Sequence, residues 1–236
     1  MQLQGAHVVV VGGSSGIGLA AAQLAKREGA TITIAGRSAE RLAAAQRTLG
    51  EARTVVADIA DEAAVRDIFS GIQRIDHVVI SAGNLGNGRI VQNDMATLRR
   101  IVDERIFGVV HVVRQAAPRI QQGSITFTSG GLSSRPRLGA AMFTASLAAV
   151  EALAPALALE LAPIRVNAVT PGLIDTPLLN AAYGAERDTL VKNRAAALPG
   201  KRIGTAEEVA QLMLMLMTNA YVNGAVLHVD GGGRYL

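Results

Sequence analysis

The 236-residue sequence has no cysteine and no tryptophan, and aromatic residues make up only 3% of it. The absence of cysteine excludes disulfide bonds, thiolate catalysis and cysteine-based metal sites, and we predict no metal site. Few aromatic rings are present to stack on nucleic-acid bases. Basic residues give a formal net charge of +4, but none forms a run longer than a pair. We therefore expect no nucleic-acid partner, and an anionic cofactor or substrate explains the mild positive charge.

A long uninterrupted apolar run is also missing. The most apolar stretch, residues 138–161, is interrupted by Glu151, Pro155 and Glu160, whereas a membrane-spanning helix needs about 20 nearly continuous apolar residues. We interpret this stretch as a core or subunit-interface helix and expect no membrane association. No basic segment precedes the first apolar run, so we expect no signal peptide and a cytoplasmic location.

Strand-like and helix-like patterns alternate along the whole chain. The expected strands are 6–11, 31–35, 53–57, 77–81, 124–128, 164–169 and 226–229. The expected helices are 16–28, 39–49, 62–70, 94–117, 138–161 and 206–218. Apolar strands joined through helices by short links predict a single α/β domain over residues 1–236, with a doubly wound, seven-stranded parallel sheet covered by helices on both faces. The irregular segment 171–205 is expected to form a lid over the ligand.

A glycine-rich turn follows the first expected strand. Four valines, Val8 to Val11, precede the turn, whose candidate binding residues are Gly12, Ser14, Ser15, Gly16, Ile17 and Gly18. Glycine lets the backbone approach a pyrophosphate closely, and the free N–H groups at the start of a helix attract the anion. We predict a dinucleotide site here.

The spacing Gly12-x3-Gly16-x-Gly18 resembles that of the short-chain dehydrogenase/reductases. Further segments resemble the family at matching places along essentially the whole chain: Asp58-Ile59, Ser81-Ala82-Gly83, Asn167 to Gly172, Arg202 to Ala210 and Asn223 to Gly232. The resemblance implies a nicotinamide dinucleotide cofactor. It places Asp58 and Ile59 at the adenine, Ala82 and Gly83 at the adenosine ribose, Pro171, Gly172 and Ile174 at the nicotinamide amide, and Thr176 at the pyrophosphate.

Gly36 lies where family members that prefer NAD usually carry an acid. Arg37 follows it at once and can make a forked contact to a 2′-phosphate, to which Ser38 can add a hydroxyl. We therefore predict NADP(H) in preference to NAD(H). The alternative interpretation is that Arg37 is an exposed turn arginine.

The family's catalytic Tyr-x3-Lys pair is absent from the chain, since neither Tyr183, Tyr221 nor Tyr235 is followed four residues later by lysine. Ser129 lies where the family has its catalytic serine. The resemblance places three other residues at the usual Tyr, Lys and Asn positions, in that order: Phe143, Leu147 and Arg105. A positioned proton donor contributes roughly 10²–10⁴ in rate, so the ordinary mechanism should be weak or absent.

Two hypotheses follow for the function. The first is an NADP(H)-dependent oxidoreductase for a small carbonyl or alcohol, in which Ser129 acts with water, an arginine or a lid residue. Tyr183, Arg135 and His111 are possible substitutes, although each also has an ordinary structural interpretation. The second is a catalytically silent NADP(H)-binding sensor or partner subunit. The resemblance also implies a homodimer or homotetramer that pairs helices 94–117 and 138–161.

Overall fold

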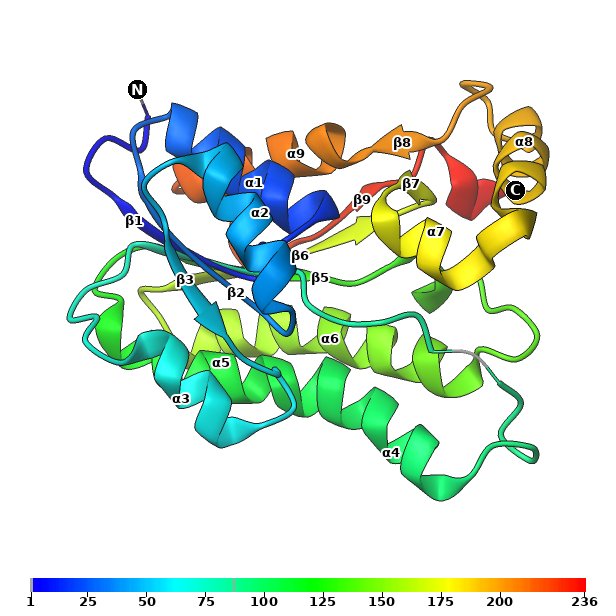
Figure 1. Ribbon diagram of the computed structural model, residues 1–236, viewed down its shortest axis with the longest axis horizontal. Helices are drawn as coiled ribbons and strands as arrows, with labels where there is room; N and C mark the ends of the chain where they lie inside the picture. The colour runs from blue at the N-terminus through cyan, green and yellow to red at the C-terminus, as the bar shows by residue number, and fades with distance from the viewer. Residues whose placement is uncertain (1, 87) are drawn as a thin grey trace.

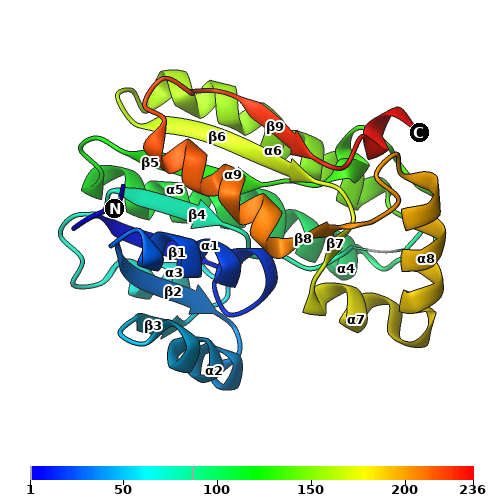
Figure 2. The same ribbon diagram turned by 90° about the horizontal axis from the view of Figure 1, so that it is seen from above.

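The computed structural model describes residues 2–86 and 88–236. Among these residues, seven parallel strands form one sheet in the order β3-β2-β1-β4-β5-β6-β9 (Figures 1 and 2). Their bounds are β1 His7–Val11, β2 Thr31–Gly36, β3 Arg53–Val56, β4 His77–Ile80, β5 Ser124–Thr128, β6 Arg165–Pro171 and β9 Val226–Val229. The predicted doubly wound parallel sheet is confirmed.

Helices cover both faces of the sheet, as Figure 1 shows. One face carries α1 Gly16–Arg27, α2 Ala39–Leu49 and α9 Ala206–Thr218. The other carries α3 Glu62–Phe69, α4 Met95–Val102, α5 Gly108–Ala116 and α6 Ala141–Glu160. Short 3₁₀ turns lie at Ala117–Arg119, Gly131–Ser133, Gly184–Glu186 and Gly233–Tyr235.

The valines of β1 show why the sheet is buried on both sides. Val8 and Val10 pack with residues of α1, α2 and α9, whereas Val9 and Val11 pack with residues of α3, α5 and α6. Side chains alternate between the faces of a strand, so a continuous apolar run supplies both cores. The two cores fix the carboxyl ends of the strands along one edge of the molecule.

The single helix expected over residues 94–117 is interrupted. Asp103–Phe107 forms a π-helical turn between α4 and α5. Apolar periodicity cannot reveal such a turn, because it adds a residue to the helix without changing its composition. π-helical turns are frequent at functional sites, and this one places Glu104 and Arg105 in buried positions.

The expectation that residues 171–205 are irregular is wrong in part, and their role as a lid stays a prediction. The segment contains β7 Ile174–Asp175, α7 Pro177–Tyr183, α8 Arg187–Ala197 and β8 Gly204–Thr205, and β7 pairs with β8 in a separate two-stranded sheet. Helix α8 contains no buried residue, so its sequence lacks the apolar periodicity by which a helix is predicted. Both helices lie beyond the carboxyl ends of the central strands (Figure 2).

Helix α6 is long and apolar enough to cross a membrane by length and composition alone. Its Phe143, Leu147, Val150 and Ala154 are buried within the fold. The helix therefore supplies one wall of the core, which agrees with its interpretation as a core helix.

Candidate functional site

The glycine-rich turn joins β1 to α1 with very close backbone contacts. Gly12 and Gly16 have φ angles of +90° and +53°, which glycine adopts without strain. A Cβ at Gly18 would lie 2.3 Å from the carbonyl oxygen of Gly12, and one at Gly12 would lie 2.5 Å from the backbone nitrogen of Ala82. The N-cap residue Ser15 makes no side-chain capping bond, so the first N–H groups of α1 remain available to an anion.

This turn forms one wall of a cavity of about 280 Å³ at the carboxyl ends of the strands, which we name the carboxyl-edge cavity. It brings together most of the predicted cofactor residues: Gly12, Ser14, Ser15, Gly16, Ile17, Gly18, Arg37, Ser38, Asp58, Ile59, Ala82, Gly83 and Thr176. Arg41, Asn84 and Glu104 also line it, although the sequence did not single them out. Segments distant in the sequence therefore meet where a doubly wound fold binds its ligand.

The nicotinamide-side candidates are arranged differently. Pro171 ends β6, Ile174 begins β7, and neither they nor Gly172 lie in the carboxyl-edge cavity. A Cβ at Gly172 would lie 2.8 Å from the Cα of Asp230, so this glycine is required by the close approach of two backbones. Thr176 precedes α7 and lies directly beside Gly16, since a Cβ at Gly16 would lie 3.3 Å from its side chain.

A buried carboxylate organises the charged side of the cavity. Glu104 Oε1 accepts hydrogen bonds from Arg100 Nε at 2.9 Å and from Arg37 Nη1 at 3.3 Å. Asn84 donates to the same carboxylate through its side-chain nitrogen at 3.1 Å and its backbone N–H at 3.3 Å. The second terminal nitrogen of Arg37 donates to Asn84 Oδ1 at 2.8 Å. Arg37 is thus held toward the end of β4.

Ser38 and Asp58 also have partners within the protein. Ser38 caps α2, and its hydroxyl accepts from the N–H of Arg41 at 3.2 Å. Asp58 pairs with Arg100 and accepts from the N–H of Ala60 at 3.0 Å. Partial burial acts to raise the pKa of the Asp58 carboxyl, but these hydrogen bonds outweigh it, and the pKa lies below its usual value. Asp58 is therefore ionised at neutral pH.

Arg105 lies beneath the cavity and is only 8% exposed. Its Nη2 donates to the carbonyl oxygen of Asn84 at 2.8 Å, and its guanidinium carbon lies 4.9 Å from the centre of the Phe143 ring. Its Nε has no partner among the described residues. Burial lowers the pKa of Arg105 to about 10, against the opposing effect of Glu104, so the side chain is still a cation at neutral pH.

The positions assigned to the family's tyrosine and lysine lie in an apolar cluster. Phe143 and Leu147 are buried with Ala140, and Leu85, Ile101 and Leu132 pack against them. Both residues lie on one face of α6, one helical turn apart, as the predicted register requires. Phe143 also provides an aromatic face for the Arg105 cation, which such a ring attracts.

Ser129, which follows β5, belongs to a cluster of hydroxyl groups that the sequence did not reveal. The Oε1 atom of Glu151 accepts from Ser129 at 2.8 Å, from Ser133 at 2.6 Å and from Thr170 at 2.9 Å. The Ser129 hydroxyl also lies 3.1 Å from the carbonyl oxygen of Leu147. The only sequence signal for Glu151 was its position, since it lies one helical turn beyond Leu147 on the same face of α6.

The possible substitutes for the missing tyrosine have other neighbours. The cation over the Tyr183 ring is Arg137, whose guanidinium carbon lies 5.9 Å from the ring centre. Arg187, four residues after Tyr183, instead pairs with Asp175 and Asp188. A ring nitrogen of His111 lies 3.2 Å from the carbonyl oxygen of Ile59, which fits its structural interpretation.

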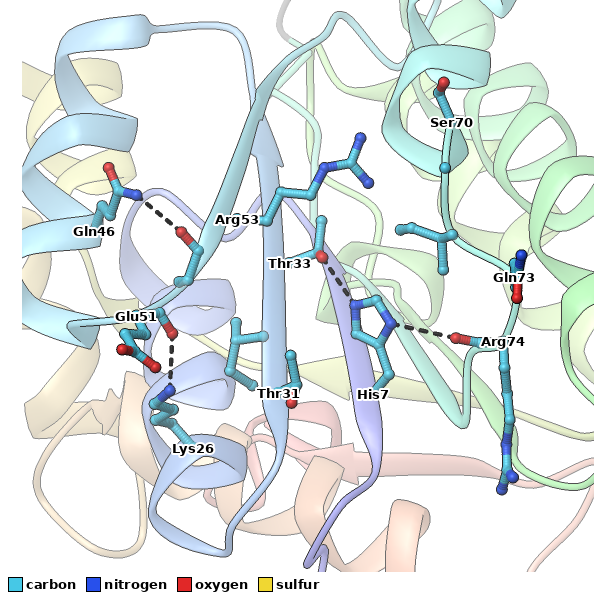
Figure 3. Close-up of a pocket in the computed structure, with 14 residues that line it drawn as sticks. His7, Lys26, Thr31, Thr33, Gln46, Glu51, Arg53, Ser70, Gln73 and Arg74 are labelled. Atoms are coloured by element: carbon cyan, nitrogen blue, oxygen red, sulfur yellow. Dashed lines mark hydrogen bonds between the residues drawn. The ribbon is translucent and has the colours of Figure 1, made fainter.

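A larger hollow of about 960 Å³ opens at the amino ends of β1, β2 and β3, and we name it the amino-edge hollow (Figure 3). One His7 ring nitrogen lies 2.9 Å from Thr33 Oγ1 and the other 3.2 Å from the carbonyl oxygen of Arg74. Lys26 donates to the carbonyl oxygen of Glu51 at 2.8 Å. His7 and Lys26 are therefore bonded within the protein.

Comparison with known proteins gives consistent matches over the full chain. The family model described as Enoyl-(Acyl carrier protein) reductase matches residues 11–233. The short-chain dehydrogenase/reductase ucsE of Acremonium sp is 31% identical, over 95% of this chain and 94% of that protein. A solved short chain dehydrogenase/reductase family protein superposes with a TM-score of 0.92 at 33% identity, over 100% of both chains. A small-chain dehydrogenase crystallised in complex with NADPH has a TM-score of 0.86 at 32% identity, over 99% of this chain and 100% of that one.

Proposed function

This chain belongs to the short-chain dehydrogenase/reductase family, and from this premise we propose that it is an NADP(H)-dependent oxidoreductase acting on a small carbonyl or alcohol. The observation that carries the proposal is the carboxyl-edge cavity, in which a glycine turn, a free helix N-terminus and Arg37 face a common space. The NADPH bound in a structural relative supports the same cofactor.

The cavity residues fit a 2′-phosphorylated dinucleotide. The uncapped start of α1 suits the pyrophosphate, because its free N–H groups and the positive end of the helix dipole attract an anion. Arg37, Ser38 and Arg41 line the cavity at the end of β2, where the 2′-phosphate is expected. Gly36 adds no carboxylate there to repel it. We therefore propose NADP(H) in preference to NAD(H).

The nicotinamide supplies or accepts the hydride when the cofactor is bound. The chain's own residues must then hold a proton for the substrate oxygen. We propose that in carbonyl reduction the Ser129 hydroxyl gives its proton to the substrate oxygen and regains one from solvent through Glu151, to which it is hydrogen-bonded at 2.8 Å, and that alcohol oxidation reverses both transfers. Ser129 is 6% exposed and Glu151 is half-buried, so the carboxylate connects the buried hydroxyl with the outside of the domain.

A second candidate, a silent NADP(H)-binding sensor or partner subunit, is favoured by a specific observation. Phe143 and Leu147 are 4% and 1% exposed within an apolar cluster. Neither can donate a proton, and together they occupy the positions where the family has its phenol and ammonium groups.

Titration of the purified protein with NADPH and NADH, followed by turnover on a broad panel of carbonyl compounds, separates these functions. We expect NADPH to bind at least tenfold more tightly than NADH and to be oxidised with some substrates. Ser129→Ala should then lower kcat by about 10²-fold or more without changing the NADPH Kd, as expected for loss of a positioned proton donor. Glu151→Gln should lower kcat less and also leave the NADPH Kd unchanged.

Binding without turnover on any substrate supports the silent alternative. Failure to bind either cofactor contradicts both functions. Equal affinity for the two cofactors contradicts the preference for NADP(H).

We also propose a homodimer or homotetramer in the cytoplasm. The alanines at 141, 145, 148 and 152 follow helical spacing on α6 and are exposed, so another helix could approach this face closely. Light scattering coupled to size-exclusion chromatography measures the mass of the assembly. A monomer at micromolar concentration contradicts this proposal.

A further inference from the structure

Glu104 combines two properties that bear on anion binding. It lines the carboxyl-edge cavity, and its carboxylate is almost completely buried, with 8% of the side chain exposed. The π-helical turn Asp103–Phe107 places it there. A negative charge thus lies in the wall of a cavity proposed to accept a phosphorylated nucleotide.

The partners of Glu104 are held with unequal strength. Arg100 donates at 2.9 Å and is also paired with Asp58. Asn84 donates through both its side chain and its backbone. Arg37 is the most distant of the side-chain donors, at 3.3 Å, and its side chain is 46% exposed. Arg37 can therefore leave while Glu104 keeps enough donors to remain satisfied.

Arg37 makes its two bonds in the same direction. One terminal nitrogen donates to Glu104 and the other donates to Asn84 Oδ1 at 2.8 Å. A guanidinium held in this way cannot also present both terminal nitrogens to a phosphate beside Ser38 and Arg41. A forked contact through both terminal nitrogens requires that these bonds be broken first, and a contact through Nε and one terminal nitrogen still competes with Glu104 for the same cation.

We propose that Glu104 is a specificity-determining residue that competes with the 2′-phosphate of the nucleotide for Arg37. The inference rests on the proposed NADP(H) site and deepens it. Glu104 lowers the affinity for 2′-phosphorylated nucleotides and leaves that for nucleotides with a free 2′-hydroxyl nearly unchanged. The preference for NADP(H) is therefore smaller than the arginine alone would give.

The test measures Kd by calorimetry for NADPH and NADH, and for two fragments without nicotinamide, adenosine 2′,5′-bisphosphate and 5′-AMP. Glu104→Gln should tighten NADPH and the bisphosphate about three- to tenfold, because the released guanidinium gains a charge-assisted bond. NADH and 5′-AMP should change by less than about twofold. Equal changes for both nucleotide classes, or no change, would overturn the proposal.

Two further variants assign the effect to Arg37. In an Arg37→Gln background, Glu104→Gln should no longer tighten NADPH, as a double-mutant cycle requires of coupled residues. Glu62→Gln removes the same charge outside the cavity, from a pair with Arg114 at 3.9 Å, and should change no Kd. A gain with Glu62→Gln, or a gain that persists without Arg37, contradicts the competition.

Glu104→Asp shortens the side chain by one methylene, which withdraws the carboxylate from Arg37, its most distant side-chain donor at 3.3 Å, and should shift the NADPH/NADH ratio in the same direction by a smaller factor. This variant tests the inference even if Glu104→Gln does not fold. If the wild-type protein binds neither NADPH nor NADH, the proposed function has failed. If it binds both but the ratio does not move in any variant, only the role of Glu104 has failed.

Discussion

One hollow opens at the amino ends of the central strands and another at their carboxyl ends. Volume alone does not predict which of them binds an anion. The amino-edge hollow measures about 960 Å³ and the carboxyl-edge cavity about 280 Å³. In the larger hollow, Lys26 and Gln46 bond to backbone carbonyl groups of the neighbouring loop. In the smaller one, the first turn of α1 has no capping side chain. Free donors, rather than size, therefore distinguish the proposed anion site.

Arginines show the same contrast. Arg53 at the amino edge donates to the carbonyl oxygens of Ile68 and Asp67, and these bonds tie β3 to α3. Arg37 at the carboxyl edge bonds to two side chains, one of which has other donors. Arg53 satisfies backbone carbonyl groups, so its role is structural. Arg37 shares a carboxylate that has other donors, so it can exchange that partner for another.

The largest expected effect concerns stability at the amino edge. Burial lowers the pKa of His77 to about 4, with a further lowering by Arg165 and an opposing effect of Asp76. The folded state thus disfavours the protonated imidazole, which the unfolded chain accepts near pH 6.5. Stability is complete above pH 6.5 and decreases as the pH falls to about 4, by about 3 kcal/mol from this group.

Urea unfolding between pH 7.5 and pH 4 measures this dependence. His77→Asn should flatten it and leave the NADPH Kd unchanged at pH 7.5. An unaltered slope in the variant shows that other groups carry the acid sensitivity.

The next prediction compares alanine substitutions at two glycines, to separate loss of NADPH binding from loss of stability through backbone strain. Gly16 in the carboxyl-edge cavity and Gly71 in the amino-edge hollow have φ angles of +53° and +72°. Alanine at either position should cost roughly 1–2 kcal/mol of stability, because its Cβ disfavours this conformation. Gly16→Ala should also weaken NADPH about 30-fold by disturbing the anion contacts at the start of α1.

Gly71→Ala is the control, since a Cβ there meets nothing within 4 Å. It should leave the NADPH Kd unchanged. Similar losses of affinity in both variants would mean that strain alone, and not the cradle, explains the effect.

The smallest expected effect is a change of nucleotide affinity that distinguishes Arg37 from Arg53. Arg37→Ala should weaken NADPH about tenfold and NADH less than twofold, because only the former carries the 2′-phosphate that this side chain is proposed to bind. Arg53→Ala should change neither affinity and should lower the melting temperature. Calorimetry and thermal denaturation give both quantities. A loss of NADH affinity equal to that of NADPH contradicts the assignment of Arg37.

The fold could be predicted almost completely from sequence patterns. The run Val8 to Val11 predicted a strand buried on both faces, and the two cores around β1 confirm it. The π-helical turn at Asp103–Phe107 and the polar helix α8 could not be predicted. Periodicity reports only which residues face a core, so it is silent about an extra residue in a turn and about a helix that buries nothing.

The candidate site was likewise predictable only in part. The glycine spacing correctly predicted a turn with close backbone contacts beside a cavity, because the glycines that such contacts require are visible in the local sequence. The partner of Arg37 could not be predicted, since Glu104 comes from a distant element and looks like an ordinary helix-surface acid in the sequence. For Glu151, the partner of Ser129, the only signal was its place one helical turn beyond Leu147.

The sequence by itself determined which segments form strands, where the glycine-rich turn lies and that no Tyr-x3-Lys pair is present. Only the tertiary structure decided that Glu104 holds Arg37, that Phe143 faces Arg105, and that three hydroxyls converge on Glu151. The physical reason is that the two kinds of property depend on residues at different separations along the chain. Backbone conformation and the alternation of apolar residues are set by neighbours along the chain, whereas hydrogen bonds and ion pairs act over a few ångströms between side chains that only the completed sheet brings together.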